Sequence, residues 1–206
     1  MFEPPIMTIK GVKLSFGPHE LFSDVELYIN RGDKISLVGR NGSGKSTLLK
    51  VIAGIIEPDS GEMFVQPGTN IAYMPQDPNI QGYRTLKAVV LSGQQTPEKA
   101  SGGEQRKAFL ARTLIGEPDI LLFDEPTNHL DMPTIQKLEE IISAFSGAVI
   151  TISHDRRFLT DVSDVTFWLD RGIMRRNNKG FKYLEEWQEQ VINQEIIEQK
   201  YLNKKI

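Results

Sequence analysis

One glycine-rich stretch, residues 39–47, limits what this chain can fold into more than any other. Residues 39–46 read Gly-Arg-Asn-Gly-Ser-Gly-Lys-Ser and match the pattern G-x-x-x-x-G-K-[ST] of phosphate-binding loops. An apolar run at 35–38 precedes the stretch, and an apolar-rich segment at 48–53 follows it. This order predicts a strand, a glycine loop and a helix. The loop would present backbone N–H groups, and the helix its positive N-terminal end, to an anion.

The last residues of this loop, Lys45 and Ser46, predict how the phosphates of a nucleotide would be bound. In the pattern, Lys45 reaches the β- and γ-phosphates of a nucleotide, and the Ser46 hydroxyl binds Mg²⁺. The alternative is an ordinary glycine turn with an exposed lysine. The strand before the loop and the helix after it favour the phosphate site.

The composition permits one α/β core and a small appendage. The chain has 206 residues, of which 39% are hydrophobic and 25% are charged, and it is too short for two full domains. It contains no cysteine, so disulfides and thiolate metal sites are excluded. No apolar run approaches the roughly 20 residues that a membrane helix needs, and the N-terminus does not resemble a signal peptide. These features predict a cytoplasmic protein with no integral membrane segment.

Charge is unevenly distributed along the chain. The net charge is −3, but residues 171–206 carry eight Lys or Arg against five Glu, which leaves −6 for residues 1–170. We therefore divide the chain into a main body at 1–170 and a basic strip with a C-terminal helix at 171–206. The main body is not expected to bind polyanions in general, whereas the basic strip could contact one.

Short apolar patterns predict strands in the first third of the chain. Segments 8–14 and 24–29 alternate or cluster apolar residues, and the pair Gly17-Pro18 between them is a turn signal. The chain is therefore expected to begin with an antiparallel β element. Segments 62–65 and 70–74 are further strand candidates.

The second half places polar residues at the ends of two apolar runs. Residues 120–123 read as a strand buried on both faces, and Asp124 and Glu125 follow it directly. Residues 148–153 predict a second such strand, with His154 just past its end. Because ligands of open α/β sheets bind at the carboxyl ends of parallel strands, a site is expected at this edge.

Helices are expected between and after these strands. The Ser-Gly-Gly turn at 101–103 opens a helix whose bare N-terminus is suited to an anion. Segment 133–147 has a first-turn proline, one apolar face and a terminal glycine, as a helix packed on a sheet would have. A last strand is expected at 164–169 and a moderately amphipathic helix at 183–205.

Together these pieces resemble the ATP-binding cassette (ABC) family over nearly the whole chain. Residues 101–104 resemble its signature motif, residues 120–125 its Walker B strand and His154 its switch histidine. Gln76 is placed like the Q-loop glutamine, and Phe16 like the aromatic residue that stacks on adenine. The resemblance implies an α/β P-loop NTPase fold of the ABC type, with the main body as the ATP-binding domain, followed by a C-terminal helix.

Two further segments resemble one branch of that family. Residues 124–131, Asp-Glu-Pro-Thr-Asn-His-Leu-Asp, and residues 153–159, Ser-His-Asp-Arg-Arg-Phe-Leu, are most similar to the ABC-F subfamily. Its Uup-like bacterial members are twin-cassette ATPases that act on ribosomes and have no membrane domain. The chain is most similar to the first cassette of such a protein.

The resemblance implies a role for each motif in the hydrolysis of Mg-ATP. Lys45 would neutralise phosphate charge, Glu125 would polarise the attacking water, and His154 would hydrogen-bond the γ-phosphate. The expected metal ligands are Ser46, Gln76 and Asp124. The residues expected to bind the nucleotide are Phe16, Gly39, Asn41, Gly42, Ser43, Gly44, Lys45, Ser46, Thr47, Gln76, Ser101, Gly102 and Gly103.

Simpler interpretations of some of these positions remain open. In these interpretations, Gln76 is a plain loop amide and His154 is an ordinary strand-end residue. Phe16 is a core aromatic, since most aromatic residues are buried, and Asp124 and Glu125 are surface charges. Paired acids at a strand end beside a phosphate loop favour the metal role instead.

The chain departs from the family pattern at two points. Only 25 residues separate Gln76 from Ser101, where the family has a multi-helix subdomain, so a truncated helical subdomain is expected. One cassette is present where the subfamily carries two. The helix at 183–205 would then be the start of a linker.

The resemblance implies an ABC ATPase cassette that hydrolyses ATP when it pairs head to tail with a second cassette in an ATP-dependent dimer. The favoured role is as part of an ABC-F translation factor that contacts ribosomal RNA through residues 171–182. The alternatives are the ATPase subunit of an ABC membrane transporter and a non-hydrolysing, nucleotide-dependent assembly module.

Overall fold

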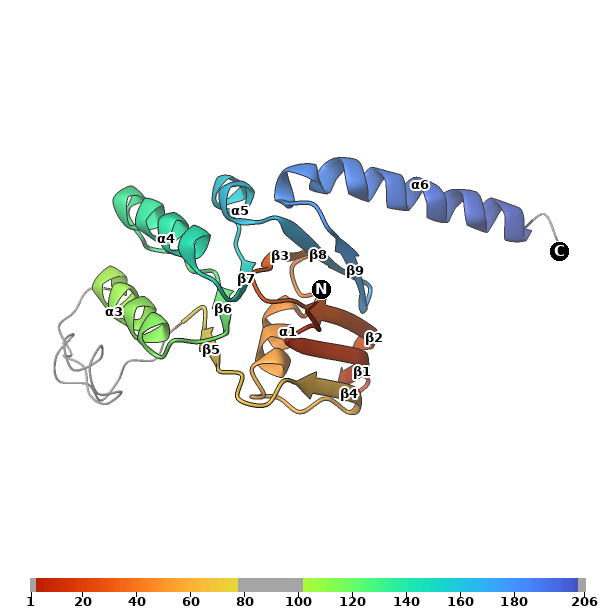
Figure 1. Ribbon diagram of the computed structural model, residues 1–206. Coiled ribbons are helices and arrows are strands. Elements are labelled where there is room, and N and C mark those ends of the chain that lie inside the picture. Colours follow the sequence, from red (N-terminus) through yellow and green to blue (C-terminus); the bar gives the residue numbers. More distant parts are fainter. Residues whose placement is uncertain (1–2, 78–101, 204–206) are drawn as a thin grey trace.

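The computed structural model describes residues 3–77 and 102–203. Helices cover both faces of one mixed sheet, and the C-terminal helix extends away from it (Figure 1). The expected truncated subdomain between Gln76 and Ser101, and Ser101 itself, lie outside the described residues.

Three antiparallel strands from the N-terminal part of the chain form one end of the sheet. They are β1 (Met7–Phe16), β2 (His19–Ile29) and β4 (Ser60–Val65), and β1 pairs with both of the others. The expected antiparallel element is thus confirmed. β1 and β2 are longer than their apolar patterns predict, because the turn between them takes only Gly17, at φ +59°, and Pro18.

The remaining strands form the other part of the sheet. They are β3 (Lys34–Gly39), β5 (Ile71–Met74), β6 (Ile120–Asp124), β7 (Ala148–Ile152), β8 (Val165–Asp170) and β9 (Ile173–Asn177). All pair in parallel except β9, which runs antiparallel to β8 and connects this part to β2. The strand order across the sheet is β4-β1-β2-β9-β8-β3-β7-β6-β5 (Figure 1).

The central strands bury side chains in a separate core on each face. In β6, Leu122 faces the core that contains α1 (Lys45–Ile52), whereas Leu121 faces the core that contains α4 (Met132–Ala144) and α5 (Arg156–Val162). Burial on both faces explains why these strands read as continuous apolar runs. Because β3, β7 and β6 pair in parallel, their carboxyl ends lie at the same edge of the sheet.

Two longer helices complete the described residues. α3 (Gly102–Ile115) precedes β6, and α6 (Leu184–Asn203) follows the short 3-10 helix η1 (Phe181–Tyr183). The rings of Trp168 and Trp187 meet edge to face at 5.9 Å, so the first part of α6 is packed on β8. No helix within residues 3–77 and 102–203 is long and apolar enough to cross a membrane.

Candidate active site

The phosphate loop lies between β3 and α1, and two of its glycines leave no room for a side chain. Gly44 precedes α1 at φ +95°, and a Cβ atom there would lie 2.7 Å from the Phe22 ring and 2.8 Å from Leu21. A Cβ atom on Gly39 would lie 2.4 Å from the backbone oxygen of Leu169. β2 and β8 therefore pack directly against the loop, and glycine is required at both positions.

Lys45 is the first residue of α1, and its ammonium is turned back over the loop. Nζ donates hydrogen bonds to the backbone oxygens of Gly39 at 2.9 Å and Arg40 at 3.0 Å. Burial lowers the pKa of Lys45, although the charges of Glu125 and Asp124 oppose this shift. The ammonium is thus held where the phosphates of a bound nucleotide would supply negative charge.

The Ser46 hydroxyl and the Asp124 carboxylate meet beside the loop. Ser46 Oγ donates to Asp124 Oδ1 at 3.1 Å, and the Tyr73 hydroxyl donates to Oδ2 at 3.4 Å. Burial raises the pKa of Asp124, and the hydrogen bonds from Ser46 and Tyr73 oppose that shift. Hydroxyl and carboxylate oxygens are ligands that Mg²⁺ prefers, so these residues fit the expected metal. Within the described residues no group of three or more His, Cys, Asp or Glu could hold a metal ion, so water and nucleotide oxygens would supply the remaining ligands.

Tyr73 is a member of the site that the sequence analysis missed. It lies on β5 and pairs with Leu122 of β6, two residues before Asp124. Burial raises the pKa of Tyr73, as does the charge of Asp124, so the phenol stays protonated and remains a donor. Its position three residues before Gln76 was the only hint in the sequence that Tyr73 belongs to the site. Its contact with Asp124 depends on the pairing of β5 with β6, which neither strand's sequence predicts.

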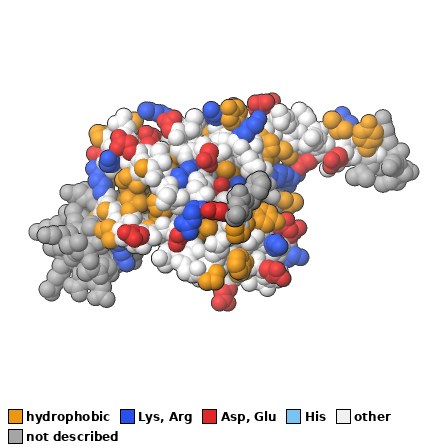
Figure 2. Space-filling view, viewed as in Figure 1, with side chains coloured by type: hydrophobic (Ala, Val, Ile, Leu, Met, Phe, Trp, Pro, Cys, Tyr) orange, Lys and Arg blue, Asp and Glu red, His pale blue; other side chains and the backbone are white. Residues whose placement is uncertain are grey.

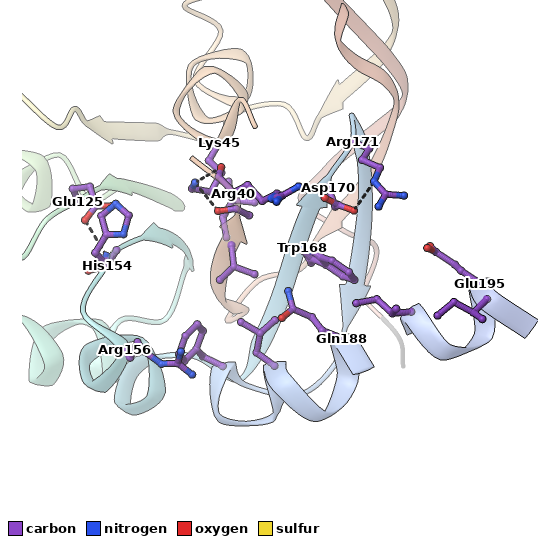
Figure 3. Close-up of a pocket in the computed structure, with 18 of the residues that line it drawn as sticks. Arg40, Lys45, Glu125, His154, Arg156, Trp168, Asp170, Arg171, Gln188 and Glu195 are labelled. Atoms are coloured by element: carbon purple, nitrogen blue, oxygen red, sulfur yellow. Dashed lines mark hydrogen bonds and ion pairs between the residues drawn. The ribbon is translucent and has the colours of Figure 1, made fainter. Parts of the chain in front are cut away.

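Glu125 and His154 contact each other at the ends of β6 and β7 (Figure 3). Glu125 is 5% exposed, and its backbone has a left-handed φ of +53°. Its N–H donates to the backbone oxygen of Ile152 at 2.9 Å, and its Oε2 accepts from the His154 N–H at 3.1 Å. His154 Nε2 lies 3.4 Å from Oε1 of Glu125, while the His154 side chain is 72% exposed. A buried carboxylate and an exposed imidazole therefore lie in contact with each other beside the phosphate loop.

A cavity of about 420 Å³ brings most of the expected residues together. The expected residues that line it are Phe16, Asn41, Gly42, Gly44, Lys45, Ser46, Thr47, Gln76, Asp124, Glu125 and His154. Leu21 and Ile152 also line it and were missed, because apolar residues of strands carry no distinguishing motif. Gly39 and Ser43 belong to the same loop but do not line this cavity.

Two of these residues lie at strand ends rather than in the core. Phe16 ends β1 and is 55% exposed, so the interpretation of Phe16 as a core aromatic is wrong. Gln76 follows β5 and is also exposed at the cavity. An exposed aromatic ring that lines the cavity is suited to stack on a base, and an exposed amide that lines it can hydrogen-bond a phosphate oxygen.

The signature residues lie at the start of α3. Gly102 and Gly103 are the first two residues of this helix. Ser101, the third expected member, lies outside the described residues. The contact of these residues with a nucleotide stays a prediction.

A second cavity of about 750 Å³ adjoins the first (Figure 3). The two cavities share Lys45, Glu125 and His154. The far wall of the second includes Trp168 of β8 and Gln188 of α6. The phosphate end of the site is thus open toward the C-terminal helix.

The basic strip contains two arginines that are engaged within the protein. Arg175 forms an ion pair with Glu195 of α6 at 2.5 Å, and its guanidinium lies 5.3 Å from the centroid of a Trp168 ring. Arg176 pairs with Asp33 at 3.1 Å. Their side chains are only 26% and 24% exposed. The expectation that the whole strip faces an external partner therefore needs correction, because β9 turns these two arginines onto neighbouring elements.

Other cations of the strip are more accessible. The Arg171 side chain is 80% exposed, and its nearest acidic partner, Asp170, lies at 3.7 Å. The ammonium groups of Lys179 and Lys182 lie 5.2 and 4.9 Å from the ring centroid of Tyr183. On the face in view in Figure 2, positive and negative side chains are otherwise intermixed.

The fold and site define an ATP-binding cassette of the P-loop ATPase class. A family model described as "ABC transporter" matches residues 22–128. The chain is 42% identical to ATP-binding protein Uup of Caulobacter vibrioides, over 97% of this chain and 36% of that protein. It is 29% identical to energy-dependent translational throttle protein EttA of Mycobacterium tuberculosis, over 81% of this chain and 41% of that protein.

The chain belongs to the ABC transporter family and is an ABC-type ATPase cassette, with ABC-F proteins among its relatives. A solved dimer of an ATP-binding cassette in a post-hydrolysis state, bound to ADP and Pi, has the same fold. The TM-score is 0.68 at 23% identity, over 83% of this chain and 97% of that one. The expected α/β ABC fold is thereby confirmed. The chain spans 36% and 41% of the length of the two relatives, so it corresponds to only part of each.

Proposed function

We propose that this chain binds Mg-ATP and hydrolyses it to ADP and phosphate when two cassettes pair. The observation that carries the proposal is the contact between Glu125 and His154 at the edge of the cavity that Lys45 and Ser46 also line. Phosphoryl transfer to water needs neutralised phosphate charge and a water held in line with the γ-phosphorus. Both requirements can be met by residues of this one cavity.

Each residue would contribute through its position. Lys45 and the loop N–H groups would bind the phosphates, and Glu125 would accept a hydrogen bond from the attacking water. His154, whose side chain is 72% exposed at the cavity, would donate a hydrogen bond to the γ-phosphate. Mg²⁺, held by Ser46 and Asp124, would neutralise charge on the phosphate oxygens.

The similarity to a solved cassette dimer supports pairing. Gly102 and Gly103 open α3, and a helix N-terminus is suited to bind an anion such as the phosphate of a partner chain's nucleotide. Cassettes of this fold form dimers, as the solved post-hydrolysis dimer does. Turnover should therefore rise more steeply than linearly with protein concentration. Phosphate release measured over a range of chain concentrations tests this, and a specific activity independent of concentration would contradict pairing.

For the cellular role we propose part of a cytoplasmic, ribosome-associated translation factor. The support is the similarity to EttA, whose name describes a translational throttle. Arg171, Lys179 and Lys182 are the cations of the basic strip that we assign to ribosomal RNA phosphates, because they are exposed. The side chains of Arg175 and Arg176 are largely covered by neighbouring elements. Contacts of this kind weaken as salt is raised.

Co-sedimentation with ribosomes, and separately with membranes, tests this role. The chain carrying Glu125→Gln should sediment with ribosomes in ATP, and Lys179→Gln with Lys182→Gln should weaken that binding and flatten its salt dependence. Lys137→Gln, on the exposed face of α4, is the matched control. Binding to membranes alone would contradict the ribosome proposal and favour the transporter subunit.

A further inference from the structure

Two hydroxyl groups join the loop after β6 to the loop after β7. Thr127 Oγ1 and Ser153 Oγ form a hydrogen bond at 3.0 Å, and Thr127 is buried. Thr127 follows Glu125 by two residues, and Ser153 immediately precedes His154. The hydroxyl pair thus connects the two segments that carry the expected water-orienting carboxylate and the expected γ-phosphate contact.

Ser153 fixes the backbone on both sides of His154. Its Oγ also accepts a hydrogen bond from the Asp155 N–H at 3.1 Å, so the hydroxyl spans the histidine. The His154 N–H in turn donates to Glu125 Oε2 at 3.1 Å. These contacts close a ring that runs from Glu125 through Thr127, Ser153 and His154 back to Glu125.

This ring accounts for an unfavourable backbone conformation. Glu125 has φ +53°, a value that a residue with a side chain adopts only when its surroundings hold it there. On one side, its N–H is bonded to Ile152. On the other side, its carboxylate is held by a hydrogen bond from the His154 N–H, and Ser153 fixes the direction of that N–H through its bond to the Asp155 N–H.

We infer that Thr127 and Ser153 are positioning residues for ATP hydrolysis, which act by holding Glu125 and His154 in one arrangement. The inference rests on the proposed function, because it concerns the rate of the same reaction. Neither hydroxyl lies among the residues that line the 420 Å³ cavity, and of the two only Ser153 lines the adjoining 750 Å³ cavity. Loss of the Thr127 hydroxyl in particular should therefore spare nucleotide binding. It should loosen the Glu125 carboxylate, and misplacement of a reacting group slows the chemical step.

The chain offers a matched control pair. Ser36 Oγ donates to Thr166 Oγ1 at 3.2 Å between β3 and β8, and both residues are fully buried. This pair also joins two neighbouring elements through a serine and a threonine, but it touches neither Glu125 nor His154. Ser36→Ala and Thr166→Val therefore remove the same groups without opening the ring.

The kinetic test compares these variants in the purified chain with Mg-ATP. We expect Thr127→Val and Ser153→Ala each to lower kcat about tenfold while KM changes less than about twofold. Thr127→Ser, which keeps the hydroxyl, should retain the parent kcat, and the double variant should be no worse than either single one. The control variants should keep kcat. Parent-like kcat in Thr127→Val, or additive losses in the double variant, would overturn the inference.

A second readout does not depend on turnover. Amide hydrogen exchange at His154 reports whether its N–H is still held by Glu125. We expect exchange about tenfold faster in Thr127→Val and Ser153→Ala, and unchanged in Ser36→Ala and Thr166→Val. Unchanged exchange in the first two would overturn the inference. A parent chain without any turnover would contradict the proposed function instead, and the exchange comparison would then decide the inference by itself.

Discussion

The Oε2 atom of Glu125 accepts a hydrogen bond from the backbone N–H of His154 at 3.1 Å. The two residues come from neighbouring parallel strands, β6 and β7, and each stands just past the end of its strand. A carboxylate and an imidazole that are fixed to each other in this way would meet the γ-phosphate as one unit. Their arrangement leads to predictions about binding, stability, association and turnover.

Lys45→Ala should abolish measurable ATP binding. Lys45 Nζ is held over the loop by two backbone oxygens, and its loss removes the fixed cation that would contact the β- and γ-phosphates. Two charge-assisted hydrogen bonds correspond to a loss in affinity of about 100-fold or more. Calorimetric titration with ATP measures the change, and Lys137→Ala on α4 serves as the control. Affinity within a few-fold of the parent would contradict the assignment of the loop.

Gly44→Ala should destabilise the fold by about 2–4 kcal/mol, because it combines a positive φ with overlap against Phe22 and Leu21. Gly54→Ala separates the two effects. Gly54 has φ +70° with nothing within 4 Å of an added Cβ atom, so its cost should be about 1 kcal/mol. Urea unfolding of both variants gives the comparison. Equal losses would show that the loop is not packed against β2 as described.

Asp124→Asn should stabilise the chain at neutral pH while it removes Mg-dependent hydrolysis. Burial raises the pKa of Asp124, so the ionised carboxylate opposes folding when the pH lies above that pKa. The gain in the free energy of unfolding, measured by urea unfolding at a series of pH values, should be largest at neutral and higher pH. It should shrink as the pH falls through the raised pKa, and vanish below the ordinary aspartate value of about 4, where both states are protonated. A variant that is less stable than the parent at pH 7 would contradict this account.

Any dimer should depend on ATP and should be strongest in Glu125→Gln. In the proposed dimer, the first residues of α3 contact a nucleotide held by the other chain, and a solved cassette of this fold is a dimer bound to ADP and Pi. A ligand bound at the shared interface favours the paired state by mass action. Light scattering with and without Mg-ATP measures the association. Steady dimerisation without nucleotide, or a monomer at every ATP concentration, would argue against this arrangement.

Local patterns in the sequence were sufficient for much of the fold. The strand, loop and helix around residues 39–53 follow from glycine spacing and apolar runs, and Asp124, Glu125 and His154 follow from their places after two buried strands. These features are local, because the backbone conformation of the loop and the burial of the strands determine the residue types at consecutive positions.

Contacts between distant segments were not predictable in the same way. β9 was interpreted as part of a basic strip, since Arg175 looks solvated until Trp168 and Glu195 are placed beside it, and Arg176 until Asp33 is placed beside it. Long arginine side chains can pack along apolar surface, which a count of charges does not reveal. Tyr73 was missed for a related reason, because its role depends on which strand pairs with β5.

The most direct test of the central claim is phosphate release from Mg-ATP by the chain carrying Glu125→Gln. The account predicts ATP affinity within about twofold of the parent and turnover lower by about 100-fold or more, as expected when a group that orients and polarises the water is lost. Glu140→Gln, an exposed change on α4, should leave both values unaltered. If Glu125→Gln binds ATP and hydrolyses it at the parent rate, Glu125 does not orient the water and the proposed site is wrong.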